Sequence, residues 1–245
     1  MRSSPAVIPV WGGIGLFVAS GLQYIAWQFD LAWLRRPIPA FPAIFPWTVI
    51  GFSGTSVLII LLASAVRTGS AGFQAAAKVI GVAIGLVSLA FLAEYLLGQP
   101  VSAFDALLFK HLLFKAGGSF PGRPAQQTCT TFLLLAIAAL VFDRKDKRRI
   151  EVFQAVVALA MFCPLLAIFG YVLFATVFQT LGGTPTTEMA VPTLVLFCIA
   201  GVAFLSFFPK EGLLSLLLGN DLAATTIRRL VPTVVLVPLA LGWIL

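Results

Sequence analysis

Long apolar runs, separated by short stretches rich in charge, Pro or Gly, set the pattern of this chain. The runs are close to the roughly 20 residues that a helix needs to cross a bilayer. They lack the alternating ten-residue pattern of an outer-membrane barrel. The pattern therefore predicts about seven transmembrane helices, at residues 6–29, 47–66, 78–97, 125–142, 151–174, 188–208 and 230–245.

Composition supports a membrane protein. The 245 residues are 60% hydrophobic and 10% charged, whereas a soluble domain is about 45–50% apolar and 25% charged. We expect an all-α, polytopic membrane helix bundle that forms a single integral-membrane domain over residues 1–245. The first run is too long for the 7–15-residue core of a signal peptide, so it is expected to be a retained span. An odd number of spans predicts that the chain is cut before an eighth.

The basic residues predict the orientation of the bundle. If the turn at 143–149 is cytoplasmic, 11 of the 16 basic residues lie on that side. The positive-inside rule then predicts a multi-pass protein of the bacterial inner (cytoplasmic) membrane with a cytoplasmic N-terminus. Residues 209–229 become a cytoplasmic connection. The net charge of +7 is attributed to this topology and to anionic lipids of the bilayer, and no nucleic-acid partner is expected.

An internal repeat marks the second, fourth and sixth runs, each of which opens with Thr four residues before Phe. The pairs are Thr48 and Phe52, Thr128 and Phe132, and Thr193 and Phe197. The runs that follow end on an aromatic residue, namely Tyr95, Tyr171 and Trp243. The spacing predicts one leading helix and three tandem helical hairpins, at approximately 46–97, 125–174 and 188–245. The threonines can cap helix starts or bond within the bilayer.

Glu94 is the sharpest candidate for chemistry, because it lies near the end of the third run. A carboxylate in a bilayer is costly and usually faces a partner or a cavity. Lys110, Lys115 and Arg123 are its candidate basic partners. Two interpretations stay open: an ion-paired structural anchor, and a sensing or proton-responsive residue.

His111 is the only histidine. A metal site needs several ligands of suitable type, so we interpret His111 as an interfacial residue of a short helix, with pH sensing as the alternative. The three cysteines lie in separate apolar runs without metal-ligand spacing. Phosphate-binding, hydrolase and zinc-protease motifs are absent. We therefore expect no metal, no cofactor and no enzymatic activity in this region.

Two further features concern helix packing. Gly81 and Gly85 form a small-xxx-small motif, which favours close approach of a second helix. Pro164 lies inside the fifth predicted span and is expected to bend it.

Several segments together resemble a known family. They are "EYLLGQPVSAFDALLF" (94–109), "PGRPAQQTCTTFLLLAIAALVF" (121–142) and "LLAIFGYVLF" (165–174). In this order they resemble the multi-span N-terminal input region of bacterial membrane-bound sensor histidine kinases and diguanylate cyclases. Arg228, Arg229, Leu230 and Pro232, followed by Gly242 and Trp243, extend the resemblance over roughly residues 40–245. The chain departs from the family pattern at Gln127, where Pro is typical.

The resemblance implies a sensory input module of a two-component or GGDEF signalling protein. An eighth span, a signalling helix and a cytoplasmic kinase or cyclase domain would follow in cis, and the parent protein would form a homodimer. We expect the outer connection 94–128 to respond to a membrane or periplasmic stimulus. The candidate sensing or ligand residues are Glu94, Tyr95, Asp105, His111, Arg123 and Thr128. The alternative is a small multi-span transporter or permease, which would need polar groups at mid-membrane depth.

Overall fold

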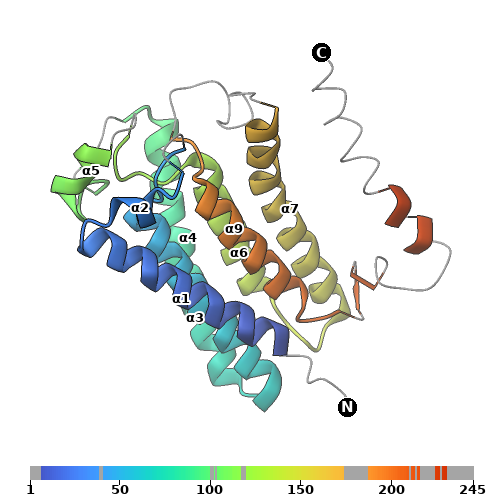
Figure 1. Ribbon diagram of the computed structural model, residues 1–245. Coiled ribbons are helices and arrows are strands. Elements are labelled where there is room, and N and C mark those ends of the chain that lie inside the picture. Colours follow the sequence, from blue (N-terminus) through green and yellow to red (C-terminus); the bar gives the residue numbers. More distant parts are fainter. Residues whose placement is uncertain are drawn as a thin grey trace.

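The computed structural model describes residues 7–38, 41–99, 102, 104–116, 120–173, 187–209, 211–212, 214–215, 224–226 and 228–230. The named elements of this part of the chain are all helices (Figure 1). They are α1 (Val7–Gln28), α2 (Ala32–Arg35), α3 (Pro46–Thr68), α4 (Ala71–Leu96), α5 (Lys110–Ala116), α6 (Gln126–Val141), α7 (Lys147–Val172) and α9 (Val191–Leu205).

Six of the seven predicted spans coincide with apolar helices. Four of these, α1, α3, α4 and α7, are long and apolar enough to cross a membrane. The helices α6 and α9 are apolar but shorter, with 16 and 15 residues. Apart from Leu230, the seventh span at 230–245 lies outside the described residues, as does Trp243. The structure thus supports a helical membrane bundle, and the number of seven spans stays a prediction.

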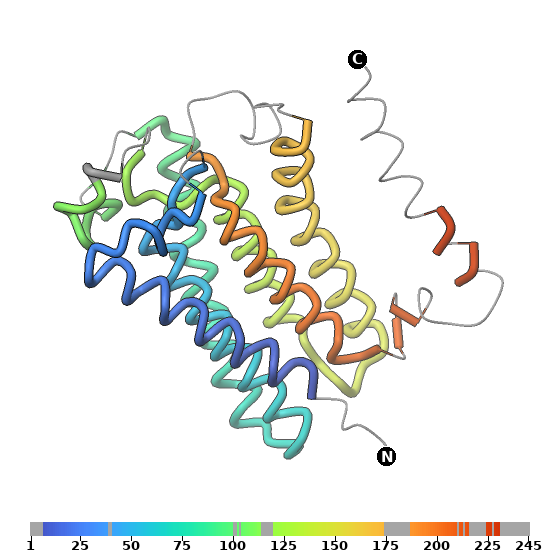
Figure 2. The backbone as a smooth tube through the Cα atoms, in the orientation of Figure 1, coloured from blue at the N-terminus to red at the C-terminus, as the bar shows by residue number. Residues whose placement is uncertain are grey.

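The six long helices form a closed ring within the described chain. Each of α1, α3, α4, α6, α7 and α9 packs against the next in chain order, and α9 returns to pack on α1. Additional contacts join α3 to α6 and α9 across the ring. Figures 1 and 2 show the α3–α4 and α6–α7 turns at the same end of the bundle as the start of α1, and α2 and α5 at the opposite end.

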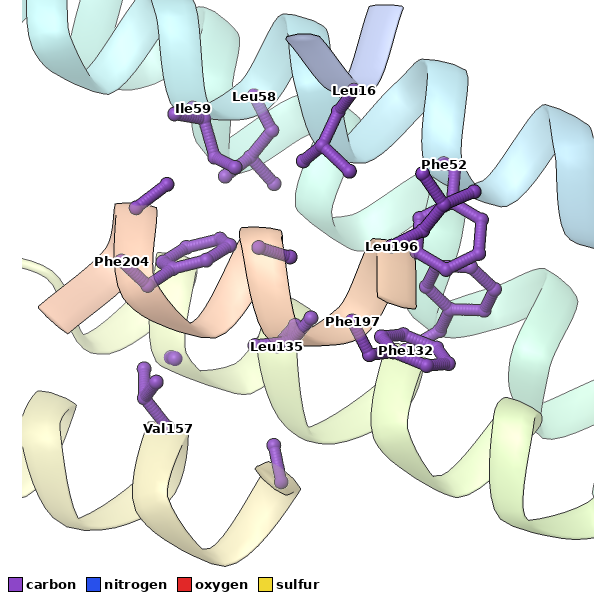
Figure 3. Packing of buried hydrophobic residues seen from close by; sticks show 14 of the residues in the cluster. Leu16, Phe52, Leu58, Ile59, Phe132, Leu135, Val157, Leu196, Phe197 and Phe204 are labelled. Atoms are coloured by element: carbon purple, nitrogen blue, oxygen red, sulfur yellow. The ribbon is translucent and has the colours of Figure 1, made fainter. Parts of the chain in front are cut away.

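Three phenylalanines meet inside this ring. Phe52 of α3 lies 5.0 Å from Phe132 of α6 and 4.7 Å from Phe197 of α9, and Phe132 and Phe197 are 4.9 Å apart between ring centroids. All three are buried, in edge or tilted geometries that suit aromatic quadrupoles (Figure 3). These are the phenylalanines of the Thr-x-x-x-Phe repeat, so the repeated residues build one shared core contact.

A second shared contact joins the helices in pairs. Near the ends of α1, α4 and α7, an aromatic N–H or O–H donates a hydrogen bond to a backbone carbonyl just before α3, α6 and α9, respectively. The bonds are Trp27 Nε1 to Ile44 O (2.8 Å), Tyr95 Oη to Pro124 O (3.0 Å) and Tyr171 Oη to Met189 O (2.6 Å). Each accepting residue lies four positions before the repeat threonine. The leading helix α1 therefore shares this contact with α4 and α7.

The repeat threonines lie just inside their helices. Thr48, Thr128 and Thr193 are each the third residue of α3, α6 and α9, and all three are buried. The cap positions are the preceding Phe45, Ala125 and Ala190, which provide no side-chain cap. The repeat threonines therefore do not occupy the cap positions, and the interpretation that they cap their helices is wrong. The division into hairpins at 46–97, 125–174 and 188–245 stays a prediction, because much of the third hairpin lies outside the described residues.

Small residues bring α4 and α6 close together. A Cβ added at Gly81 would lie 3.4 Å from the Cβ of Ala139, and one added at Gly85 would lie 3.4 Å from the Cβ of Ala136. The small-xxx-small motif thus packs within the bundle.

The surface of the ring is apolar, and the charges gather at its ends. Large exposed side chains include Trp11, Phe17, Val79, Leu86, Phe162 and Val202. Such an extended apolar surface fits a lipid environment. At the end formed by the turns, Arg144 Nη1 donates to Val66 O at 3.0 Å and joins the basic turn to α3. We call this the basic end, and we call the opposite end, which carries α2 and α5, the α5 end.

Replacing Phe197 by Ala should destabilise the bundle by about 3–5 kcal/mol, because it leaves a cavity against two further rings. The free energy of unfolding in detergent micelles, measured by denaturant titration, checks this. Phe162→Ala is the matched control, because Phe162 is 53% exposed on α7. Equal losses in the two variants would contradict a central role for the three phenylalanines.

Candidate functional site

A buried guanidinium is the centre of the α5 end. The Arg123 side chain has 0% exposure. Its Nε lies 3.0 Å from Asp105 Oδ1 and its Nη2 lies 2.7 Å from Asp105 Oδ2, a two-pronged ion pair. Nη2 also lies 3.2 Å from Glu94 Oε2. Nη1 donates to the carbonyl of Gln99 at 3.2 Å. We call Glu94, Asp105 and Arg123 the ionic cluster.

A tight turn places Arg123. Pro121 and Gly122 occupy the two central positions between Phe120 and Arg123, and the Arg123 N–H donates to Phe120 O at 3.2 Å. Gly122 has φ of +94°, as the second central residue of a type II turn requires. A Cβ at Gly122 would lie 2.2 Å from the carbonyl oxygen of Asp105. Glycine is therefore required twice, for its dihedral angle and for this close approach.

Asp105 is fixed by its own local motif. The Ser102 N–H donates to Asp105 Oδ2 at 2.7 Å, and the Asp105 N–H donates to Ser102 Oγ at 3.2 Å. This reciprocal pair has the spacing of a helix capping box. The Asp105 carboxylate, itself fully buried, thus accepts hydrogen bonds from Ser102 and from two nitrogens of Arg123.

Aromatic rings lie against the same guanidinium. The Arg123 Cζ atom is 5.1 Å from the centre of the Tyr95 ring and 4.7 Å from that of Phe120. Both distances are within the range of a cation–π contact. Tyr95 therefore serves two neighbours, because its hydroxyl also donates to Pro124 O.

The electrostatics keep the Arg123 guanidinium charged. Burial acts to lower the pKa of Arg123, but hydrogen bonding to Asp105 and the charges of Asp105 and Glu94 outweigh it, and the pKa is raised. Arginine is effectively always protonated in proteins. Two carboxyl groups, those of Asp105 and Glu94, therefore share one buried guanidinium, and removing one partner of such a buried pair is strongly destabilising.

The structure brings together four of the six predicted site residues: Glu94, Tyr95, Asp105 and Arg123. Of the proposed partners of Glu94, Arg123 makes the ion pair, and Lys110 is exposed. Thr128 is buried one turn after Pro124 in α6. His111 is exposed on α5, apart from the ionic cluster. Among the described residues, no group of three His, Cys, Asp or Glu side chains is placed to hold a metal.

Several contributors were missed at the sequence level. Ser102, Gly122 and Phe120 position or flank the ionic cluster, and Gln99 offers a backbone carbonyl. Two signals could have found the first two. They are the S-x-x-D spacing of residues 102–105, and the Pro-Gly dipeptide that marks a turn.

A cavity of about 220 Å³ lies next to this cluster, between α3, α4 and α6. Trp47 and Phe91 line the cavity, and both rings contact Phe104 and each other in T-shaped or tilted geometries, with centroid distances of 4.5–5.7 Å. Trp47 Nε1 also donates to Phe104 O at 3.0 Å. We call these three residues the aromatic roof. Because Phe104 precedes Asp105 in the chain, the roof connects the cavity to the ionic cluster.

No family model, curated protein or solved structure matches this chain.

Arg123→Met should destabilise the protein by about 3–5 kcal/mol, because it leaves the buried Asp105 carboxylate without its partner. Denaturant titration in detergent micelles measures this loss. Arg149→Met is the matched control, because Arg149 is 52% exposed and pairs with Asp143 at 3.6 Å, so a change within about 1 kcal/mol is expected. Similar small changes in both variants would show that the buried pair does not hold the α5 end.

Proposed function

We propose that this region is the sensory input module of a bacterial signal-transduction protein in the inner membrane. Its output would be a histidine kinase or diguanylate cyclase domain, in cis, in a parent protein that forms a homodimer. The observation that carries the proposal is the ionic cluster of Glu94, Asp105 and Arg123. The sequence resemblance to sensor input regions supports the identity of the output.

The ionic cluster has the geometry of a latch. Glu94 belongs to the last turn of α4, whereas Asp105 and Arg123 belong to the connection between α4 and α6. Pairing these groups joins the connection to the helix through directional contacts that are either made or broken. A stimulus shifts such an equilibrium only through its different affinity for the two states. Added protons, cations or polar ligands would have that effect on a site where two carboxyl groups share one guanidinium.

The same connection holds a strained residue. Phe109 has φ of +53°, in the left-handed region that a bulky side chain rarely adopts. Its ring lies 5.6 Å from Tyr24 and 5.9 Å from Trp27 of α1. Strain of this kind costs about 1–3 kcal/mol and persists where surrounding contacts enforce it, often at switch regions. A second arrangement of the connection would release it.

The alternative of a transporter or permease has less support. The Phe52, Phe132 and Phe197 rings fill the middle of the ring of helices. Hydroxyls of α3 donate to carbonyls of that helix: Thr55 to Gly51 O at 2.8 Å and Ser56 to Ser53 O at 2.9 Å. These two buried hydroxyls are therefore already engaged within α3. Flux through liposomes that contain the purified protein would favour the alternative.

The proposed orientation puts the basic end in the cytoplasm, where an output domain would lie. The α5 end, with the ionic cluster, would then face the periplasm. A change at the α5 end would travel to the basic end along α4, whose N-terminal Gln74 side chain donates to Phe142 O at 2.8 Å.

Glu94→Gln and Asp105→Asn should each change the output of the complete gene product without changing its membrane insertion. Each substitution replaces one carboxyl group of the cluster by an amide and keeps the side-chain shape. Autophosphorylation and cyclic di-GMP synthesis are measured in membranes, with insertion followed by membrane extraction. Glu151→Gln, an exposed site at the basic end, is the matched control. The proposal is contradicted if both cluster variants give the same output as the unmodified protein, with and without stimulus.

A further inference from the structure

The cavity beside the aromatic roof is long and narrow. Its wall on α4 extends from Ile80 to Phe91, which corresponds to about 16 Å along a helix axis, and its wall on α3 extends from Trp47 to Gly54, about 10 Å. It therefore follows the helices from the α5 end toward the middle of the bundle. Its volume of about 220 Å³ exceeds the roughly 150 Å³ of an apolar cavity that binds benzene.

The lining of the cavity is apolar, with two exceptions. Cys129 already interacts with Pro124 O, with Sγ at 3.7 Å. Ser88 is 4% exposed and brings one hydroxyl to the lining. The site thus offers hydrocarbon contacts along its length and one hydroxyl group.

The cavity also has access to the lipid. Ile50 of α3 and Ala83 of α4 belong to its lining and are exposed on the outer surface of the ring. Apolar cavities of this kind are not stabilised by water. The surrounding bilayer offers an occupant of matching shape and polarity, which is a flexible hydrocarbon chain.

We propose that this cavity binds one hydrocarbon chain of a membrane amphiphile, with its polar end at the α5 end. The chain comes from a phospholipid or from a free fatty acid, which share this chemistry. Binding is a property of the cavity alone. Its effect on output rests on the proposed function, because an occupant that contacts Trp47 and Phe91 would move Phe104 and the adjacent Asp105.

The test uses the purified protein in nanodiscs of phosphatidylcholine. One arm adds palmitic acid with a diazirine near the middle of its chain, and the other adds phosphatidylcholine with the same labelled chain. After irradiation, mass spectrometry locates the labelled residues. Ala83→Phe places a ring in the cavity mouth. Ala90→Phe is the matched control, because Ala90 is an exposed residue of α4 that does not line the cavity.

We expect the label to concentrate on the cavity walls of α3 and α4. Ala83→Phe should reduce this labelling about tenfold, which corresponds to about 1.4 kcal/mol, and Ala90→Phe should leave it unchanged. Labelling by the phosphatidylcholine probe identifies a phospholipid chain, and labelling by palmitic acid alone identifies a free fatty acid. Label spread evenly over the lipid-facing surface, or equal in the two variants, overturns the proposal. The labelled positions in the unmodified protein decide this even where Ala83→Phe fails to fold.

Labelling is measured without any output, so its failure is distinct from failure of the proposed function. If the cavity is labelled but Glu94→Gln does not change the output, the binding site is supported and the sensing role is contradicted. If the cavity is not labelled but Glu94→Gln changes the output, the sensing role is supported and the binding site is contradicted.

Discussion

The burial of one full positive charge constrains the α5 end of this protein. Arg123 has no exposed surface, and a buried charge without partners is strongly unfavourable. The connection between α4 and α6 must therefore bring Asp105 to it, and α4 must end where Glu94 reaches it. Three further features meet that requirement. Gly122 and the Ser102 motif position Arg123 and Asp105 against each other, and the rings of Tyr95 and Phe120 cover the guanidinium.

The ionic cluster is a local addition to a repeated architecture. Three helix pairs, α1 with α3, α4 with α6 and α7 with α9, share the hydrogen bond from an aromatic side chain to a backbone carbonyl, which we call the aromatic clamp. Each pair also contributes one phenylalanine to the common core. The residue before the clamping aromatic is Ala26, Glu94 or Gly170 in α1, α4 and α7. One pair thus carries an acid where the other two carry small residues. The acid of the ionic cluster therefore occurs in only one of three pairs that share the same aromatic contacts. In our proposal, the connection after α4 is the segment that changes its arrangement.

Sequence patterns predicted the parts of the structure that depend on local composition. Six apolar runs became helices because their length and hydropathy suit no other element in a bilayer. The need of Glu94 for a partner also followed from its position. The choice of Arg123, the burial of Asp105 and the return of α9 to α1 depend on contacts between distant segments, which no periodicity encodes. His111 drew attention as the sole histidine, yet its exposed place on α5 keeps it out of the cluster.

A double-mutant cycle on Asp105 and Arg123 tests the central claim most directly. The free energies of unfolding of Asp105→Leu, Arg123→Met and the double variant, measured in the same micelles, give the coupling energy of the pair. A buried guanidinium that depends on Asp105 predicts a coupling of about 2–3 kcal/mol, with the double variant more stable than the sum of the single losses allows. A coupling below about 0.5 kcal/mol, within the range of independent sites, would contradict it.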